Sequence, residues 1–306
     1  MNNGTMDKPC TAEKIFSACF LPVQRLPLGF HYAFGRFLAF LAEKVLGYRR
    51  DVVMVNLARS FPEMKWKEIR SLSRKFYSHL GEIIAEAIWF GGSKGNPERL
   101  SAGGICTYSN PELLADLYLK SPSVMIMDSH FGNWEIIGGL LQYIGKEMPF
   151  GPDDVVVVYK KLENRFWNDF MAGNRSAPIE DYRGYVESRE VLRYAIEHKA
   201  QKKIYIFPTD QFPYRFATKH EIPSFMHQKT QVMTGAAALA HKFHMPVLYM
   251  GMRRTGKGHY VTDLKIVAAD AADMSPEEIM TEYYRLLEED VKANPENYLW
   301  SHNRWK

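Results

Sequence analysis

Residues 124–137 read VMIMDSHFGNWEII, and this stretch decides the predicted fold. Its first four residues are apolar, as in a buried strand, and Asp128, Ser129 and His130 follow directly. Glu135 comes five residues after the histidine, at the start of a helical pattern over residues 135–144. We therefore expect a strand, then a turn that holds His130, then a helix with Asn133 as its N-cap and Glu135 in its first turn.

The rest of the central region alternates between strand-like and helix-like patterns. Further apolar, β-branched runs occur at residues 155–159, 204–207 and 246–252. Helical patterns lie between and beside them, at residues 163–173, 185–199 and 230–243. This alternation predicts an α/β fold with a mainly parallel central sheet flanked by helices.

Polar side chains follow each of the four predicted strands. The carboxyl ends of parallel strands meet at one edge of a sheet, and ligands bind there. We therefore expect one site at this edge, built from a histidine, an acid and several cations. In chain order the strands end in Asp128, Ser129 and His130; in Lys160 and Lys161; in Thr209, Asp210 and Gln211; and in Arg253 and Arg254.

His130 and Glu135 are the candidate catalytic pair. On a regular helix two residues five apart are rotated by about 140°, so the pair can meet only if His130 lies in the preceding turn. A carboxylate that orients a histidine makes it a general base. The alternative is a polar turn without a catalytic role. Further ligands at metal-binding spacing are missing, so we expect neither a metal nor a cofactor.

Excess positive charge is confined to the amino-terminal part of the chain. Residues 1–60 contain eight Lys/Arg and four Asp/Glu, whereas the remaining residues contain 31 of each. A basic segment that is also apolar favours an anionic membrane surface, and we do not expect a nucleic acid partner. The three cysteines have no C-x-x-C spacing, which argues against a zinc ribbon and fits a reducing compartment.

An apolar helix is predicted at residues 26–42, LPLGFHYAFGRFLAFLA. Phe30, Phe34, Phe37 and Leu41 have helical spacing and lie on one stripe. Seventeen residues span roughly 26 Å at about 1.5 Å per residue, short of the ~30 Å hydrocarbon core of a bilayer. We interpret residues 1–60 as a membrane-associating helical segment and residues 61–306 as the catalytic domain. The alternative is that the helix is an ordinary core helix.

Two glycine-rich motifs are interpreted as turns. Residues 91–95, GGSKG, match the G-x-S-x-G hydrolase pattern, but they follow a helical pattern over residues 67–90 instead of a strand. Residues 255–259, TGKGH, lack the spacing of a phosphate-binding loop and are typical of a hairpin turn. Residues 275–278, SPEE, predict the start of a last helix.

The HFGNWE motif resembles the signature of the bacterial lipid A late acyltransferases, a branch of the glycerolipid acyltransferase superfamily. Further segments resemble this family: residues 55–70, the YKKLEN…GNR segment over 159–175, the FPTDQ block at 207–211, and the IPSF…TGAAALA and PENYLWSHNRWK blocks. The resemblance covers nearly the whole chain. Lys160 stands where the family usually has Arg, and Thr209 replaces a usual Pro.

The resemblance implies acyl transfer from an acyl thioester, on acyl carrier protein, to a hydroxyl of a lipid A-type glycolipid. His130 and Glu135 would then be the catalytic dyad, with Arg175, Asp210, Lys160 and Gln211 as substrate-binding residues. It also implies a location on the cytoplasmic face of the inner membrane, peripheral or shallowly anchored.

Three alternatives stay open from the sequence. The first keeps the chemistry but uses another acceptor, such as an amino-lipid, another glycolipid or a pigment-type lipid. The second is a non-catalytic module that binds a lipid or a carrier protein. The third is a metal-dependent hydrolase, which a chelator would inactivate.

Overall fold

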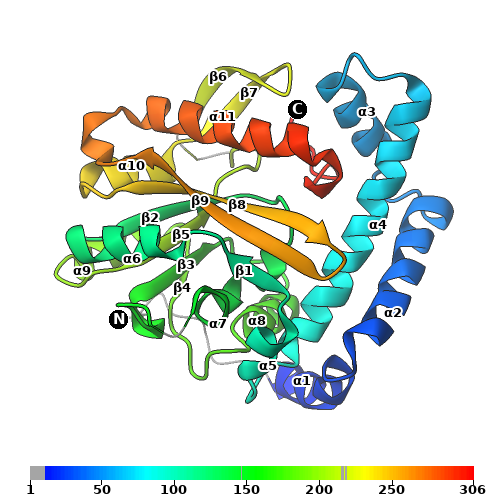
Figure 1. Ribbon diagram of the computed structural model, residues 1–306, viewed down its shortest axis with the longest axis horizontal. Helices are drawn as coiled ribbons and strands as arrows, with labels where there is room; N and C mark the ends of the chain where they lie inside the picture. Colours follow the sequence, from blue (N-terminus) through cyan, green and yellow to red (C-terminus); the bar gives the residue numbers. More distant parts are fainter. Residues whose placement is uncertain (1–10, 146, 215–216, 218) are drawn as a thin grey trace.

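A central sheet with helices on both faces forms the body of the protein in the computed structural model, which describes residues 11–145, 147–214, 217 and 219–306 (Figure 1). The first ten residues of the predicted membrane-associating segment lie outside the described part. The α-helices are α1 Thr11–Gln24, α2 Leu28–Phe40, α3 Arg50–Ser60, α4 Trp66–Gly91, α5 Glu98–Gly103, α6 Pro111–Lys120, α7 Leu140–Ile144, α8 Arg165–Arg175, α9 Val191–Glu197, α10 Gly235–Lys242 and α11 Pro276–Ala293. The strands are β1 Cys106–Tyr108, β2 Val124–Asp128, β3 Val155–Tyr159, β4 Tyr185–Glu187, β5 Ile204–Pro208, β6 Lys219–Phe225, β7 Gln228–Met233, β8 Val247–Gly256 and β9 His259–Ala268.

The central sheet has seven strands in the order β1-β9-β8-β2-β5-β3-β4. All neighbouring pairs are parallel except β8 and β9, which form an antiparallel hairpin. Strands β6 and β7 form a separate antiparallel pair. The prediction of an α/β fold with a mainly parallel sheet flanked by helices is confirmed.

Alternate residues of β2 face two different hydrophobic cores. Met125 and Met127 pack in one core with residues of α10 and α11, and Val124 and Ile126 pack in the other with residues of α5, α6 and α7. Figure 1 shows these two helical layers on opposite faces of the sheet. A strand covered on both faces needs apolar residues at every position, which explains the unbroken run before Asp128.

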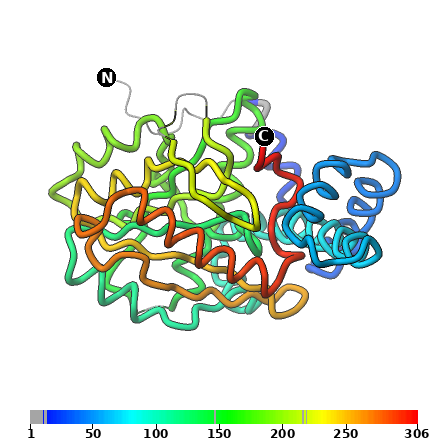
Figure 2. The backbone as a smooth tube through the Cα atoms, turned by 90° about the horizontal axis from the view of Figure 1, so that it is seen from above, coloured from blue at the N-terminus to red at the C-terminus, as the bar shows by residue number. Residues whose placement is uncertain are grey.

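Helices α1 to α4 form a layer at one end of the sheet (Figure 2). Helix α4 packs against α2 so closely that a Cβ atom at Gly35 would collide with the backbone of Gly81. The carboxyl-terminal residues run between this layer and the body, where Asn56 of α3 donates to the carbonyl oxygens of Trp300 and His302. Several segments that are distant in sequence therefore meet beside α4.

Three predicted helices differ from the observed structure. The pattern over 185–199 divides into β4 and α9, because the buried Tyr185 and Val186 pair with β3. The pattern over 230–243 divides into β7 and the alanine-rich α10. The segment after His130 begins as a 3₁₀ helix, Trp134–Gly139, and becomes α-helical only in α7.

The other local predictions are confirmed. The helix predicted at residues 67–90 is α4, and the GGSKG motif lies in the turn after it. Residues 255–259 form the end of the β8–β9 hairpin. Ser275 caps α11, since its hydroxyl accepts from the Glu278 amide while the Glu278 carboxylate accepts from the Ser275 amide.

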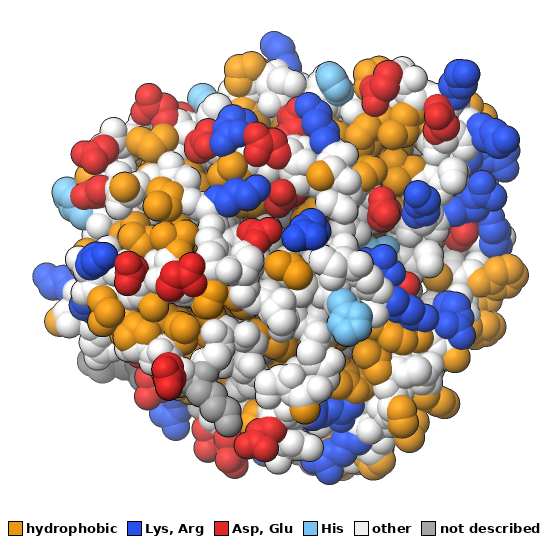
Figure 3. Space-filling view, in the orientation of Figure 1, with side chains coloured by type: hydrophobic (Ala, Val, Ile, Leu, Met, Phe, Trp, Pro, Cys, Tyr) orange, Lys and Arg blue, Asp and Glu red, His pale blue; other side chains and the backbone are white. Residues whose placement is uncertain are grey.

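The phenylalanine stripe of α2 points away from the protein. Phe30, Phe34 and Phe37 are 44–55% exposed, as is the neighbouring Phe40 at 56%, whereas His31, Tyr32 and Gly35 on the opposite face are buried. Leu41, the fourth predicted member of the stripe, lies just after α2 and is only partly exposed. The exposed phenylalanines therefore contradict the alternative in which α2 is an ordinary core helix. In Figure 3, hydrophobic side chains reach the surface along the edge where α2 lies, next to basic side chains. Among the described residues, no helix combines the length and the apolar character needed to cross a membrane.

Candidate active site

Strand register brings His130 and Asp210 together. Strands β2 and β5 are parallel neighbours, and Asp128 is paired with Pro208 at their carboxyl ends. The Thr209 amide donates to the Asp128 carbonyl oxygen at 3.1 Å, which extends the pairing by one residue. His130 and Asp210 each follow their strand by two residues, so they meet just beyond the edge of the sheet.

The imidazole of His130 is held at both ring nitrogens. Its Nδ1 lies 2.7 Å from Oδ1 of Asp210, and its Nε2 lies 3.0 Å from the side-chain nitrogen of Gln211. A carboxylate only accepts and an amide nitrogen only donates, which assigns the proton to Nδ1 and the lone pair to Nε2. This is the tautomer that a general base needs.

The charge of Asp210 changes the basicity of His130. Burial lowers the pKa of His130, but the Asp210 charge and hydrogen bond raise it, and the net pKa is above its ordinary value. Burial raises the pKa of Asp210, while His130 lowers it, and the net pKa is below its ordinary value. The structure therefore pairs a strengthened base with an ionised carboxylate.

Glu135 lies in the first turn after Asn133, whose side chain accepts from the Glu135 amide at 3.1 Å. The predicted N-cap is thus confirmed. The predicted direct contact with His130 is not formed, because the Glu135 carboxylate turns toward α8. Its Oε2 accepts from Arg175 Nε at 2.8 Å, and its Oε1 accepts from Arg175 Nη2 at 2.7 Å and from Trp134 Nε1 at 3.0 Å.

The two carboxylates thus have other partners than the sequence predicts. Asp210, predicted to bind substrate, contacts His130, and Glu135, predicted to contact His130, binds Arg175. Glu135 still acts on His130 through its charge, which raises the pKa of the imidazole. Burial lowers the pKa of Arg175, but Glu135 raises it more, so the guanidinium is firmly charged.

The predicted cations separate into two groups. Lys160 lies at the expected edge, with its Nζ 4.4 Å from the ring centre of Tyr214. Strand β8, in contrast, continues past Arg253 and Arg254 to Gly256, so these two arginines do not mark a strand end. Arg254 binds Glu82 of α4 at 2.8 Å, and Arg253 is exposed on the hairpin.

A cleft of about 1290 Å³ is lined in part by Gln211, whose side chain contacts Nε2 of His130. Apolar residues form much of its wall: Val158, Val191, Leu192, Phe207, Phe212, Met233, Ala236 and Leu239. The charged lining residues that the structure describes are mostly basic: Lys160, Lys161, Arg189, Lys219, Lys242 and Lys306, with Glu163 and Glu187. Such a cleft suits an amphiphile with an anionic head group.

A second histidine on the cleft, His302, was not found from the sequence. Its Nε2 accepts from the Phe212 amide at 3.1 Å, so its lone pair is already used. Burial lowers the pKa of His302 to about 4. His302 therefore supports the loop after β5, and His130 is the better base.

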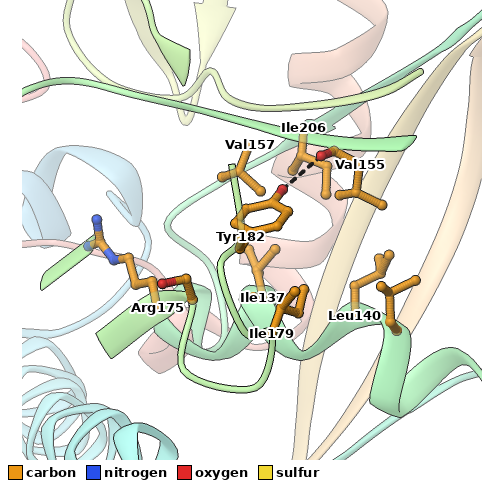
Figure 4. Close-up of a pocket in the computed structure, with 11 residues that line it drawn as sticks. Ile137, Leu140, Val155, Val157, Arg175, Ile179, Tyr182 and Ile206 are labelled. Carbon is orange, nitrogen blue, oxygen red and sulfur yellow. Dashed lines mark hydrogen bonds between the residues drawn. The ribbon is translucent and has the colours of Figure 1, made fainter. Parts of the chain in front are cut away.

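A small aliphatic pocket lies behind Arg175, but its volume is only about 10 Å³. Figure 4 shows its lining residues, which include Ile137, Leu140 and Ile206, with the Arg175 guanidinium directed away from them. A volume of this size holds about one water molecule. The larger cleft that Gln211 lines is therefore the better place for a long apolar ligand.

A histidine paired with a carboxylate at the carboxyl edge of a parallel sheet, near a large amphiphilic cleft, is an arrangement typical of enzymes that activate a hydroxyl or water. A family model described as bacterial lipid A biosynthesis acyltransferase matches residues 13–306. The chain belongs to this family, and the protein is an acyltransferase. It is 23% identical over 297 residues to the lipid A biosynthesis lauroyltransferase of Escherichia coli strain K12, a match that covers 93% of this chain and 88% of that protein.

Proposed function

We propose that this acyltransferase moves a fatty acyl chain from an acyl thioester on acyl carrier protein to a hydroxyl of a lipid A-type glycolipid. The observation that carries the proposal is the hydrogen bond between Nδ1 of His130 and Asp210, which keeps the lone pair on Nε2, where the side chain of the cleft residue Gln211 contacts it. The name of the E. coli relative and the family description support the glycolipid acceptor. No metal or cofactor takes part in the proposed reaction.

The proposed reaction is a direct transfer. The acceptor hydroxyl replaces the Gln211 amide at Nε2 of His130, which is 3.0 Å from it in the structure. His130 takes the hydroxyl proton, the alkoxide oxygen attacks the thioester carbonyl, and a C–O bond forms. The tetrahedral intermediate then expels the thiolate, which receives the proton from the imidazolium. Asp210 and the more distant Glu135 stabilise the imidazolium through their charges.

Arg175 is proposed to stabilise negative charge on the substrate. Glu135 binds its Nε and Nη2 atoms, which fixes the plane of the guanidinium. A preorganised cation of this kind stabilises developing charge without having to reorganise. Glu135 thereby contributes to transfer as the residue that orients Arg175, in addition to its effect on His130.

Mass spectrometry tests the proposed function directly. Purified protein is incubated with acyl-loaded acyl carrier protein and a lipid A precursor that has a free hydroxyl, with the His130→Ala variant as control. The expected product is the precursor plus one acyl chain, formed by the wild-type protein only. Free fatty acid as the sole product would contradict acyl transfer. If only an amino-lipid or another glycolipid is acylated in the same assay, that lipid is the acceptor and the lipid A-type acceptor is wrong.

We also propose that α2 places the protein on the cytoplasmic face of the inner membrane. The exposed Phe30, Phe34 and Phe37 form the apolar part of the contact. Arg36, Lys44 and Arg50 are exposed near them in sequence and supply positive charge for anionic head groups.

Replacing Phe30, Phe34 and Phe37 with Glu is expected to release the protein from anionic vesicles in a sedimentation assay at low salt, because both apolar area and charge complementarity are lost. The matched control replaces Leu119, Ile196 and Ile266, which are similarly exposed on other elements. This control is expected to stay bound. Equal release of both variants would show that α2 is not the contact.

Lys160→Arg is expected to keep transfer within about twofold of the wild type, because it retains the charge and restores the planar cation usual in the family. Lys160→Glu is expected to lower the rate at least about fivefold with an anionic acceptor, and less in high salt. Arg253→Glu, an exposed cation outside the cleft, serves as the control for net charge. An unchanged rate in Lys160→Glu would remove Lys160 from the acceptor site.

A further inference from the structure

A fully buried carboxylate, Glu86 of α4, lies next to the active-site loop and has no part in the chemistry described so far. Its side chain is 0% exposed. Burial of a charge is costly unless donors surround it, and burial raises the pKa of Glu86. Helix α4, which carries Glu86, lies between α2 and the sheet (Figure 1).

Three donors from three different elements converge on this carboxylate. Tyr32 of α2 donates to Oε1 at 2.6 Å, and Tyr260 of β9 donates to Oε2 at 2.7 Å. The side-chain nitrogen of Asn133 also donates to Oε2, at 2.7 Å. The two tyrosines fix Glu86, and Glu86 then fixes the carboxamide of Asn133.

Asn133 connects Glu86 to the active-site loop through its side-chain amide. Its nitrogen is used by Glu86, so its Oδ1 must point the other way, and it accepts from the Glu135 amide at 3.1 Å. Helix α4 contacts the same loop at a second point, where Nε2 of its residue His79 lies 3.1 Å from the Gly132 carbonyl oxygen. The loop between His130 and Glu135 is therefore set by α4 as well as by the strand before it.

We propose that Glu86 is a positioning residue for acyl transfer, which orients Asn133 and through it the first turn that carries Glu135. Glu86 is fully buried and does not line the cleft, so it offers no surface to a substrate. Its loss is expected to lower kcat and to leave KM for both substrates nearly unchanged. A displacement of about 1 Å in a catalytic group can cost up to about 10²-fold in rate.

Glu86→Met and Glu86→Gln form the matched pair for the test. Both side chains have nearly the length of Glu, but only Gln keeps an oxygen that accepts from Asn133. We expect Glu86→Met to lose at least about tenfold in kcat, and Glu86→Gln to stay within about threefold of the wild type. If packing alone mattered, the two variants would have the same kcat.

Hydrogen exchange of the Glu135 amide gives a readout that does not depend on activity. This amide is expected to exchange faster in Glu86→Met and to stay protected in Glu86→Gln. A folded Glu86→Met variant with wild-type kcat and wild-type protection of Glu135 would overturn the proposal. If Glu86→Met does not fold, Asn133→Ala breaks the same link from the loop side, and wild-type kcat in that variant would overturn the proposal equally.

The kinetic part of this inference rests on the proposed acyl transfer, whereas the exchange part does not. A wild-type protein without transfer activity would contradict the proposed function, and the exchange comparison would still decide the role of Glu86.

Discussion

His130→Ala is expected to transfer acyl chains about 10²–10⁴-fold more slowly than the wild type, the usual contribution of a general base. The variant should fold normally, because His130 is only partly buried and lies beyond the end of β2. Steady-state transfer and thermal unfolding, measured on the same preparation, separate the two effects. Transfer at the wild-type rate would exclude His130 as the base.

Asp210→Asn tests the same base through its pH profile. The base works only when it is neutral, so wild-type activity falls as pH drops through the pKa of His130, which lies above its ordinary value of 6.5. Burial still lowers this pKa in the variant, whereas the Asp210 charge, the largest of the causes that raise it, is lost, so the pKa of His130 falls. The acid limb of the profile is therefore expected to move to lower pH in Asp210→Asn, while the maximum rate falls. A limb that stays in place would show that Asp210 does not set the pKa of the base.

Most of the fold could be predicted from the sequence because its signals are local. The buried runs of β2, β3, β5 and β8 are apolar at nearly every position, and the α4 pattern repeats over 26 residues. The wrong predictions of secondary structure concern segments in which two short elements share one continuous pattern, as β4 and α9 do. Tyr185 and Val186 fit a helix by spacing, and only pairing with β3 makes them a strand.

The residues of the site could be predicted, but their partners could not. His130, Asp210 and Gln211 each follow an apolar strand, so their place at the edge is visible in the chain. That β5 is the neighbour of β2, with Asp128 opposite Pro208, is a property of the sheet order. This register places Asp210 within hydrogen-bond distance of His130, and the Glu135 carboxylate binds Arg175 instead. Glu86 carried no sequence signal, because its three hydrogen-bond partners are distant in the chain.

Arg175→Lys is expected to lower acyl transfer at least about tenfold, because it keeps the charge but cannot form the two parallel bonds that the Arg175 guanidinium makes to Glu135. Arg175→Ala is expected to lose more. Burial raises the pKa of Glu135, and Arg175 at present outweighs burial and lowers it. Removing the guanidinium leaves a carboxylate that is 12% exposed without its cation, which costs about 1–3 kcal/mol of stability.

The Arg254–Glu82 pair provides a control for the structural part of this loss. Nε and Nη2 of Arg254 both contact Oε2 of Glu82, at 2.9 and 2.8 Å, whereas those of Arg175 contact the two different oxygens of Glu135. The side chains of the two pairs are similarly buried, at 26% and 12% exposed for Arg254 and Glu82 and 33% and 12% for Arg175 and Glu135. Arg254→Lys is therefore expected to reduce the melting temperature about as much as Arg175→Lys. Its rate of transfer should fall less than about threefold, because Arg254 lies on the hairpin and binds Glu82 of α4 instead of the Glu135 carboxylate next to the catalytic histidine.

Replacing both members of the Arg175–Glu135 pair by Leu separates stability from catalysis. A buried ion pair can often be exchanged for apolar residues without loss of stability, whereas removal of one partner is destabilising. The double variant should therefore recover the melting temperature that Arg175→Ala loses. Its acyl transfer should stay at the level of Arg175→Ala, since the oriented cation is still missing. A double variant with wild-type transfer would show that the pair only holds α8 against the loop, and His130 with Asp210 would then be the whole of the catalytic centre.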